Sequence, residues 1–345
     1  MMFNISHTND RDCTIDTMKG ITILLMIYAH VSDVDIVNRM IFSFHMPLFF
    51  ILGGYLSKDV SDCNGLLLYT GKNARRLLIP YFVTMLLICL WVWRFEILKL
   101  RFNLTWHPML NLFWGSGDMY DSQYGRLYVG PLWFLFAMFV CREFFYLVQC
   151  IAHRLSSMCI DIRIIVATIV ILLSLLSVWL YPYLQPMAWN MIPGIAAMIF
   201  YMIGWLMRQF SMPLWPKILS LACWLAMILL HSNMDMRICE YGIWPINVIG
   251  ACGGTWLVHC ISDCLNNLSK KTIVVYWITR FLIWCGMSSL ALLCMHSMDL
   301  MGGVSGYFLG FLGDSLIIEL SSHFAVPLLL VWGISKIGVL RKIYF

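Results

Sequence analysis

Charged residues are scarce in this chain of 345 residues: Asp, Glu, Lys and Arg make up only 12%, against about 25% in a soluble protein. Hydrophobic residues make up 61%, with 15 Trp and 21 Phe, and the mean hydropathy is +0.80. So few charges cannot cover a surface that faces water. The composition therefore predicts a polytopic integral membrane protein and excludes soluble enzymes and secreted disulfide scaffolds. The net charge of +5 does not indicate a nucleic-acid partner, because the basic residues are spread between hydrophobic segments.

Metal-binding and disulfide motifs are also lacking. The 13 cysteines lie mostly inside apolar runs and form no CxxC; the nearest approach is Cys260 and Cys264, one helical turn apart. A cysteine inside a membrane helix is usually a small packing residue, so we expect neither a metal site nor a disulfide framework. The first apolar run, near Thr14, has no small-residue cleavage site, and we expect a retained helix there. No internal repeat or second soluble domain is visible, so residues 1–345 are expected to form one membrane domain.

Ten apolar segments are long enough to cross a bilayer, which takes about 20 residues. They lie near residues 14–33, 40–57, 77–95, 131–150, 162–181, 188–207, 214–231, 242–261, 281–298 and 320–337. The ninth has the least defined limits, because residues 272–280 are apolar as well. Continuous apolar runs lack the in–out alternation of a membrane β-barrel. The sequence thus predicts an all-α bundle of about ten transmembrane helices.

The basic residues predict how this bundle is oriented. With the N-terminus in the cytoplasm, all but six of the 23 Lys and Arg residues fall on the cytoplasmic side, as the positive-inside rule requires. The six exceptions are Arg39, Arg94, Lys99, Arg101, Arg126 and Arg237. Ten spans then place both termini in the cytoplasm. The one long loop, residues 96–130, falls on the outer side; its aromatic and polar residues predict either a sugar-binding surface or an interfacial cap with an aromatic belt.

Ionisable residues within the spans are the best indicators of function, because the membrane makes them costly. In the first span, Lys19 and His30 are 11 residues apart, which places them about 20° from the same helix face and about 16 Å apart along the axis. Asp16, three residues before Lys19, can pair with it. One face therefore carries a cation near the cytoplasmic surface and an imidazole deep in the bilayer.

Two further histidines are expected at a depth similar to that of His30. His45 lies near the outer end of the second span and His296 near the outer end of the ninth. Three histidines from three helices are typical of a proton-transfer site, although each taken singly is also explained as a structural histidine bonded to a backbone carbonyl. In the second span, the pair Gly53 and Gly54 predicts close approach of a neighbour or a ligand to the backbone.

A group of cations precedes the third span on the cytoplasmic side: Lys72, Arg75 and Arg76, in the segment GKNARRLLIPYF. Two interpretations stay open. Such cations commonly act as topology signals and lipid anchors. Their closeness also suits a ligand with several phosphates.

Several of these blocks together resemble one family, the bacterial acyltransferase family 3 of multi-spanning O-acyltransferases, and in particular its fucose 4-O-acetylase-like branch. Lys19 and His30 resemble the family's basic residue, ten intervening residues and histidine. FSFHMPLFFILGGYL, KNARRLLIPYF, GPLWFLFAMF and GMSSLALLCMH resemble its second, third, fourth and late helices. There are two departures: Gly53 stands where the family commonly has Ser, and Met138 stands where some relatives have Glu.

The resemblance implies transfer of an acetyl or similar group from cytoplasmic acetyl-CoA to a sugar hydroxyl of a surface polysaccharide or its lipid-linked precursor, in the inner membrane of a bacterium. It implies no permanently bound cofactor, since acetyl-CoA is a co-substrate, and it assigns no oligomeric state. His30 matches the family's essential histidine and is expected to act as general base or as acyl relay. Lys19 is expected to hold the CoA end of the donor or to stabilise charge near the thioester, and His45 to orient His30 or bind the acceptor. Lys72, Arg75 and Arg76 are expected to contact the CoA phosphates, and Trp133 and His296 to bind the acceptor.

Two other classes fit the buried polar residues. One is a transporter or flippase for a polar or lipid-linked solute, and the other is a lipid-linked glycosyltransferase or polymerase. Inverted repeats would favour transport, and none are visible in the sequence. Release of free thiol from acetyl-CoA discriminates between them, because only an acyltransferase should produce it.

Overall fold

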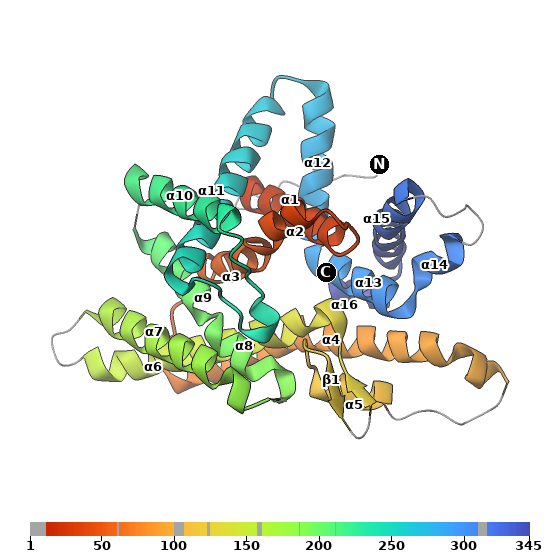
Figure 1. Ribbon diagram of the computed structural model, residues 1–345, viewed down its shortest axis with the longest axis horizontal. Helices are drawn as coiled ribbons and strands as arrows, with labels where there is room; N and C mark the ends of the chain where they lie inside the picture. The colour runs from red at the N-terminus through yellow and green to blue at the C-terminus, as the bar shows by residue number, and fades with distance from the viewer. Residues whose placement is uncertain are drawn as a thin grey trace.

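The computed structural model describes residues 12–60, 62–99, 107–122, 125–156, 161–185, 187–210, 212–309 and 316–345. These residues are almost entirely helical (Figure 1). The exception is a hairpin of two three-residue strands, β1 (Tyr120–Ser122) and β2 (Gly125–Leu127). A helix satisfies its backbone hydrogen bonds internally, which is what lipid demands of a spanning segment. The helical membrane fold predicted from the sequence is confirmed.

Every predicted span coincides with one helix or with a broken pair of helices. The single helices are α1 (Cys13–Ala29), α4 (Cys63–Leu98), α6 (Trp133–Leu155), α7 (Ile162–Leu180), α10 (Leu214–Leu229), α11 (Trp244–Leu268) and α15 (Leu316–Ile334). The pairs are α2 (Asp35–Phe42) with α3 (His45–Tyr55), α8 (Met191–Ala196) with α9 (Met198–Gln209), and α12 (Ile273–Met287) with α13 (Ser289–Gly302). Short elements complete the chain: α5 (His107–Trp114), α14 (Val304–Leu309), α16 (Gly338–Tyr344), and the 3-10 turns η1 (Gly130–Leu132), η3 (Tyr181–Tyr183), η4 (Ala188–Asn190) and η5 (Met236–Ile238).

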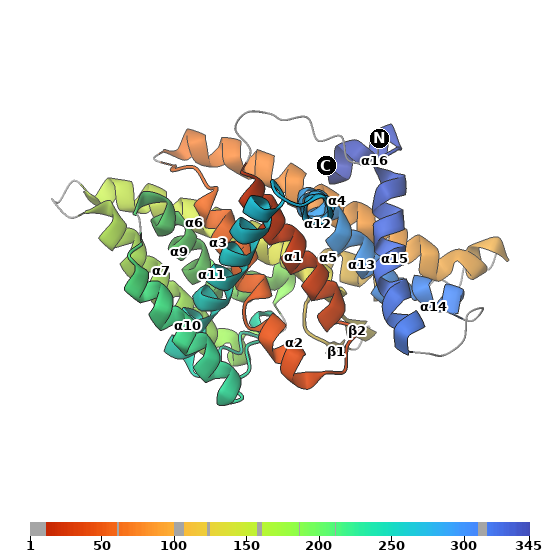
Figure 2. The ribbon, with the colours of Figure 1, turned by 90° about the horizontal axis from the view of Figure 1, so that it is seen from above.

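Among the described residues, five helical segments are long and apolar enough to cross a membrane, and α2 with α3 together form one of them. The number rises to eight if the bent pairs α8–α9, α12–α13 and α15–α16 each count as one span. The ninth predicted span, 281–298, straddles a bend of 76° between α12 and α13, so it is not one straight helix. The apolar residues 272–280, which left its limits open, mostly belong to α12. Beyond the bend, α13 lies between α1, α4 and α15 (Figures 1 and 2).

Glycines bring two pairs of helices into direct backbone contact. Where α1 crosses α12, a Cβ added to Gly20 would lie 1.9 Å from the Leu282 carbonyl oxygen, and one added to Gly286 would lie 1.8 Å from that of Asp16. Small residues permit such close packing between helices in a membrane. The crossing therefore fixes α1, the helix that carries Lys19 and His30, against α12.

The second crossing joins α3 to α9. A Cβ on Gly54 would lie 1.8 Å from the Tyr201 carbonyl oxygen, and one on Gly204 would lie 1.9 Å from that of Ile51. The close approach that the Gly53–Gly54 pair predicts is confirmed, and the neighbour is α9.

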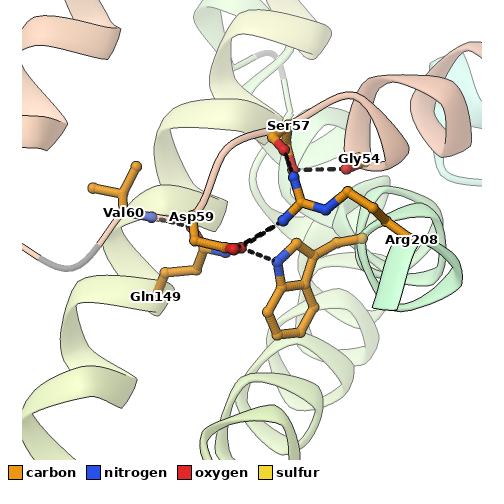
Figure 3. A network of polar contacts seen from close by, with 7 residues as sticks. Gly54, Ser57, Asp59, Val60, Gln149 and Arg208 are labelled. Atoms are coloured by element: carbon orange, nitrogen blue, oxygen red, sulfur yellow. Dashed lines mark hydrogen bonds and ion pairs between the residues drawn. The ribbon is translucent and has the colours of Figure 1, made fainter. Parts of the chain in front are cut away.

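A polar network fixes the turn between α3 and α4 (Figure 3). The Arg208 guanidinium donates to both carboxylate oxygens of Asp59 at 2.9 Å, and Trp205 Nε1 donates to the same carboxylate at 2.6 Å. Arg208 also donates to the Ser57 carbonyl, and the Val60 N–H donates to Gln149 Oε1 at 3.2 Å. The turn that leads into α4 is therefore bound to both α9 and α6.

Replacing Arg208 with lysine is expected to lower the free energy of unfolding by about 1 kcal/mol, because lysine keeps the charge but loses the two-pronged bond to the exposed Asp59 carboxylate, which joins the turn to α9. Thermal unfolding in detergent measures the change. The matched control is Arg163→Lys, since Arg163 pairs with the exposed Asp161 at the start of α7 and spans no such turn. Equal shifts in the two variants would contradict the assigned role of the network.

Candidate active site

Three histidines meet at the point where α1, α3 and α13 come together. His30 caps the C-terminus of α1, His45 begins α3, and His296 lies in α13. The ring centroids of His30 and His296 are 5.5 Å apart, with the rings nearly perpendicular. The Phe42 ring lies 5.6 Å from His30 and 5.3 Å from His45. The structure thus brings together the three histidines that the sequence placed at similar depth.

Two of these rings have a defined tautomer when neutral. Nδ1 of His30 lies 2.9 Å from the Met26 carbonyl oxygen, and Nδ1 of His45 lies 3.0 Å from that of Ile41. A carbonyl oxygen only accepts, so each Nδ1 carries the hydrogen and each Nε2 carries the lone pair. The backbone bond of a structural histidine is therefore present at both positions, and it leaves the outer nitrogen of each ring basic.

A cavity of about 510 Å³ is lined by His30 and His45. Its volume is within the range of small-molecule sites, about 300–1,000 Å³. His30 is exposed to it, whereas His45 lines it with only 4% of its surface exposed. Trp133, the first residue of α6, also lines the cavity; its expected role in acceptor binding stays a prediction. Among the described residues no group of three His, Cys, Asp or Glu is arranged to hold a metal ion.

The last residues of the long loop 96–130 form part of the cavity wall. Tyr128 and Gly130 line the cavity, and within the loop lie α5 and the β1–β2 hairpin. Residues 100–106 and 123–124 of the loop lie outside the described residues. The described part therefore places an aromatic residue beside the candidate site.

One wall of the cavity is a turn that the sequence analysis missed. Asp235 caps η5 and accepts from both the backbone N–H and the side chain of Arg237, at 3.0 Å each. Two backbone bonds, 2.8 and 2.9 Å long, join Asp235 to Glu240 and close the turn. Burial alone would lower the pKa of Arg237, but the Asp235 carboxylate outweighs it and the pKa lies above the ordinary value for arginine. From the sequence, Arg237 was counted only as a loop charge; the available signal was that Asp235, Arg237 and Glu240 lie close together in one short loop of a chain with few charges.

His296 lies behind His30 and is not among the residues that line the cavity. It is 0% exposed, and within the described part of the chain neither ring nitrogen has a hydrogen-bond partner. One turn along α13, the fully buried Asp299 binds His323 Nδ1 of α15 at 2.7 Å and accepts from the Ser305 N–H at 2.6 Å. From the sequence, Asp299 was expected in a loop beyond the ninth span, and His323 was not expected at the site.

The expected donor-binding residues lie elsewhere. Lys19 pairs with Asp16 at 3.8 Å, three helical turns from His30, and does not line the cavity. Three exposed residues on α4 carry the cluster of positive charge: Lys72, Arg75 and Arg76. No described residue of α4 lines the cavity.

The helix surface that carries these cations is anchored to α6. Glu143 accepts from Asn73 at 2.9 Å and from the Thr70 hydroxyl. The Lys72 ammonium lies 5.7 Å from the centre of the Tyr69 ring, which itself packs against Tyr146. The cations therefore project from a fixed helix surface.

The fold and the cavity define a multi-pass helical membrane protein with a polar, histidine-lined site among its helices. The chain belongs to the acyltransferase 3 family: the family's model, described as an acyltransferase domain, matches residues 14–336. This confirms the family resemblance of the sequence motifs.

Two curated relatives share part of this match. The nodulation protein NolL of Mesorhizobium japonicum is 28% identical over 206 residues, which cover 53% of this chain and 50% of that protein. The nodulation protein NolL of Sinorhizobium fredii is 28% identical over 141 residues, 38% of this chain and 34% of that protein. The chain thus spans about half the length of the first relative and about a third of the second. No solved structure matches the chain.

Proposed function

We propose that this protein is a membrane O-acyltransferase that moves an acetyl or similar acyl group from cytoplasmic acyl-CoA to a sugar hydroxyl of a cell-surface polysaccharide or its lipid-linked precursor. The proposal places it in a bacterial inner membrane, among lipids, with ten spans and both termini in the cytoplasm. Family membership supports the reaction class. The observation that carries the chemistry is the placement of His30 at the cavity wall, with Nδ1 bonded to the Met26 carbonyl, which leaves Nε2 as the basic nitrogen of the neutral ring.

The thioester is already activated, so the protein's task is to make the acceptor hydroxyl nucleophilic. Nε2 of His30 takes the hydroxyl proton as the oxygen attacks the thioester carbonyl carbon. The carbon–sulfur bond then breaks, and the departing thiolate takes the proton back from the imidazolium to give free coenzyme A. In the covalent variant, Nε2 itself attacks the thioester and the acyl-imidazole passes the acyl group on. His45, whose Nε2 is also basic, orients the acceptor or His30.

The donor is proposed to enter from the cytoplasmic side. Its phosphates would bind the exposed cations of α4, and its acyl end would pass Lys19 on the α1 face that leads to His30. Release of free thiol from acetyl-CoA by the purified protein, dependent on a polysaccharide precursor pool, tests the reaction. A transporter or flippase would bind solute without releasing thiol.

Replacing Lys72 and Arg75 together with glutamine is expected to raise the KM for acetyl-CoA about tenfold or more, because charge-assisted bonds to phosphate are lost. The KM for S-acetyl-pantetheine, which lacks the nucleotide phosphates, should stay unchanged. Initial rates with the two donors measure both values.

The matched control is Lys270→Gln, an exposed cation at the end of α11. If the α4 cations are only topology signals or lipid anchors, the double variant will accumulate less protein but keep the KM of the wild type for both donors. That result would remove the donor-binding role.

A further inference from the structure

A second group of polar residues faces the histidines across the cavity and has no part in the acyl-transfer steps above. It consists of Arg39 from α2 and of Asp235, Arg237 and Glu240 from the turn around η5. We propose that these four residues, with the aromatic rings beside them, form a binding subsite for an uncharged sugar unit of the acceptor. The inference rests on the proposed function in taking the acceptor to be a saccharide, and it adds which residues hold the sugar and that the sugar carries no charge.

The side chains on this wall offer the hydrogen-bond donors and acceptors that the hydroxyl groups of a sugar require. Arg237 and Asp235 are bonded to each other, and both reach the cavity surface. Arg39 is held by Asp35 and His231, and its Nε is buried without a hydrogen-bond partner among the described residues. Guanidinium groups donate only and carboxylates accept only, so the wall offers both kinds of bond to hydroxyl groups.

The charges on this wall decide between a neutral and an anionic sugar. The described charged residues that line the cavity are two cations, Arg39 and Arg237, and two anions, Asp235 and Glu240. In the general-base role proposed above His30 is neutral, and the Nδ1 bonds of His30 and His45 set the tautomer of each neutral ring. An anionic sugar would meet two carboxylates without a net positive field to offset them, whereas a neutral sugar is bound by paired groups whose charges cancel.

The subsite lies where a bound sugar would meet the base. Tyr128 and Trp133 supply flat apolar surfaces on the same cavity. His30 lines it as well, so a sugar held against the η5 turn presents its hydroxyl groups to the base. This fits an acceptor that enters from the side of the membrane opposite to the α4 cations.

Saturation-transfer NMR on the protein in lipid nanodiscs tests the subsite without any need for turnover. The probes are a panel of neutral methyl hexosides and methyl 6-deoxyhexosides and the matching methyl uronates. In the wild type, the neutral glycosides are expected to give signals about tenfold stronger than the uronates, and Arg237→Ala is expected to weaken them about tenfold, the effect of losing a hydrogen bond to a charged group.

Arg163→Ala is the matched control, because Arg163 also pairs with an aspartate two residues before it but lies at the start of α7, away from the cavity. It should give the signals of the wild type. Uronate signals equal to the neutral ones, neutral signals unchanged in Arg237→Ala, or no signal from any glycoside would overturn the inference. The wild-type comparison of neutral and uronate probes decides the matter even if Arg237→Ala does not fold.

Thiol release measured on the same samples separates the two proposals. Neutral glycosides that bind without thiol release would leave the subsite standing and remove the acyltransferase. Thiol release with equal binding of both probe classes would remove the neutral-sugar subsite and leave the acyltransferase standing.

Discussion

Replacing His30 with alanine is expected to lower acceptor-dependent thiol release from acetyl-CoA by about 10²–10⁴-fold, the usual contribution of a general base, and more if the ring carries the acyl group. The ring is exposed at the cavity, and within the described part of the chain its hydrogen bond is to a carbonyl of its own helix, so the fold should survive the change. The measurement is free thiol released per minute by purified protein, with size-exclusion profiles of both proteins beside it.

The control for this variant is His259→Ala. His259 is exposed on α11 and does not line the cavity, so turnover should be unchanged. Full activity in His30→Ala would exclude both the base and the relay. Loss of activity together with a changed elution profile would point to His30 as a structural residue.

Replacing Gly286 with valine is expected to prevent normal accumulation of the folded protein, with a cost of about 3 kcal/mol or more. Even the first added carbon would lie 1.8 Å from the Asp16 carbonyl oxygen, which is backbone and cannot move aside without separating α1 from α12. The yield of monodisperse protein and its thermal midpoint in detergent measure the loss.

Gly71→Val provides the comparison. Gly71 lies in α4, and a Cβ there meets nothing within 4 Å, so the protein should accumulate as the wild type does. If both valine variants accumulate equally well, the glycine crossing does not hold α1 in place.

The sequence was informative wherever burial alone determines structure. Long apolar runs located the helices, and the first of them places Lys19 in α1 and His30 at its C-terminal end. Hydropathy records that a segment avoids water, but it does not record the direction of the helix axis. For that reason the 76° bend between α12 and α13 could not be predicted, nor could the start of α4 at Cys63, well before its apolar core.

The residues of the candidate site also fall into two groups, those that the sequence predicts and those that it does not. The histidines could be predicted because each lies at the end of an apolar run or close to it, where depth follows from position. The Asp235–Arg237 wall and the Asp299–His323 pair could not be predicted, because the role of each pair depends on which residues the fold packs beside it. A loop carboxylate and one that is completely buried look alike in a sequence without the tertiary contacts.

The buried pair of Asp299 and His323 has a consequence for how the chain enters the membrane. Asp299 is fully enclosed, and its imidazole partner follows it by 24 residues, on a later helix. While the chain emerges in order, the Asp299 side chain must remain in contact with water until His323 is synthesised, because an unpaired carboxylate is costly in lipid. The final position of α13 in the membrane therefore depends on the insertion of α15. Since His296 lies in α13, its position behind His30 is reached only after α15 has inserted.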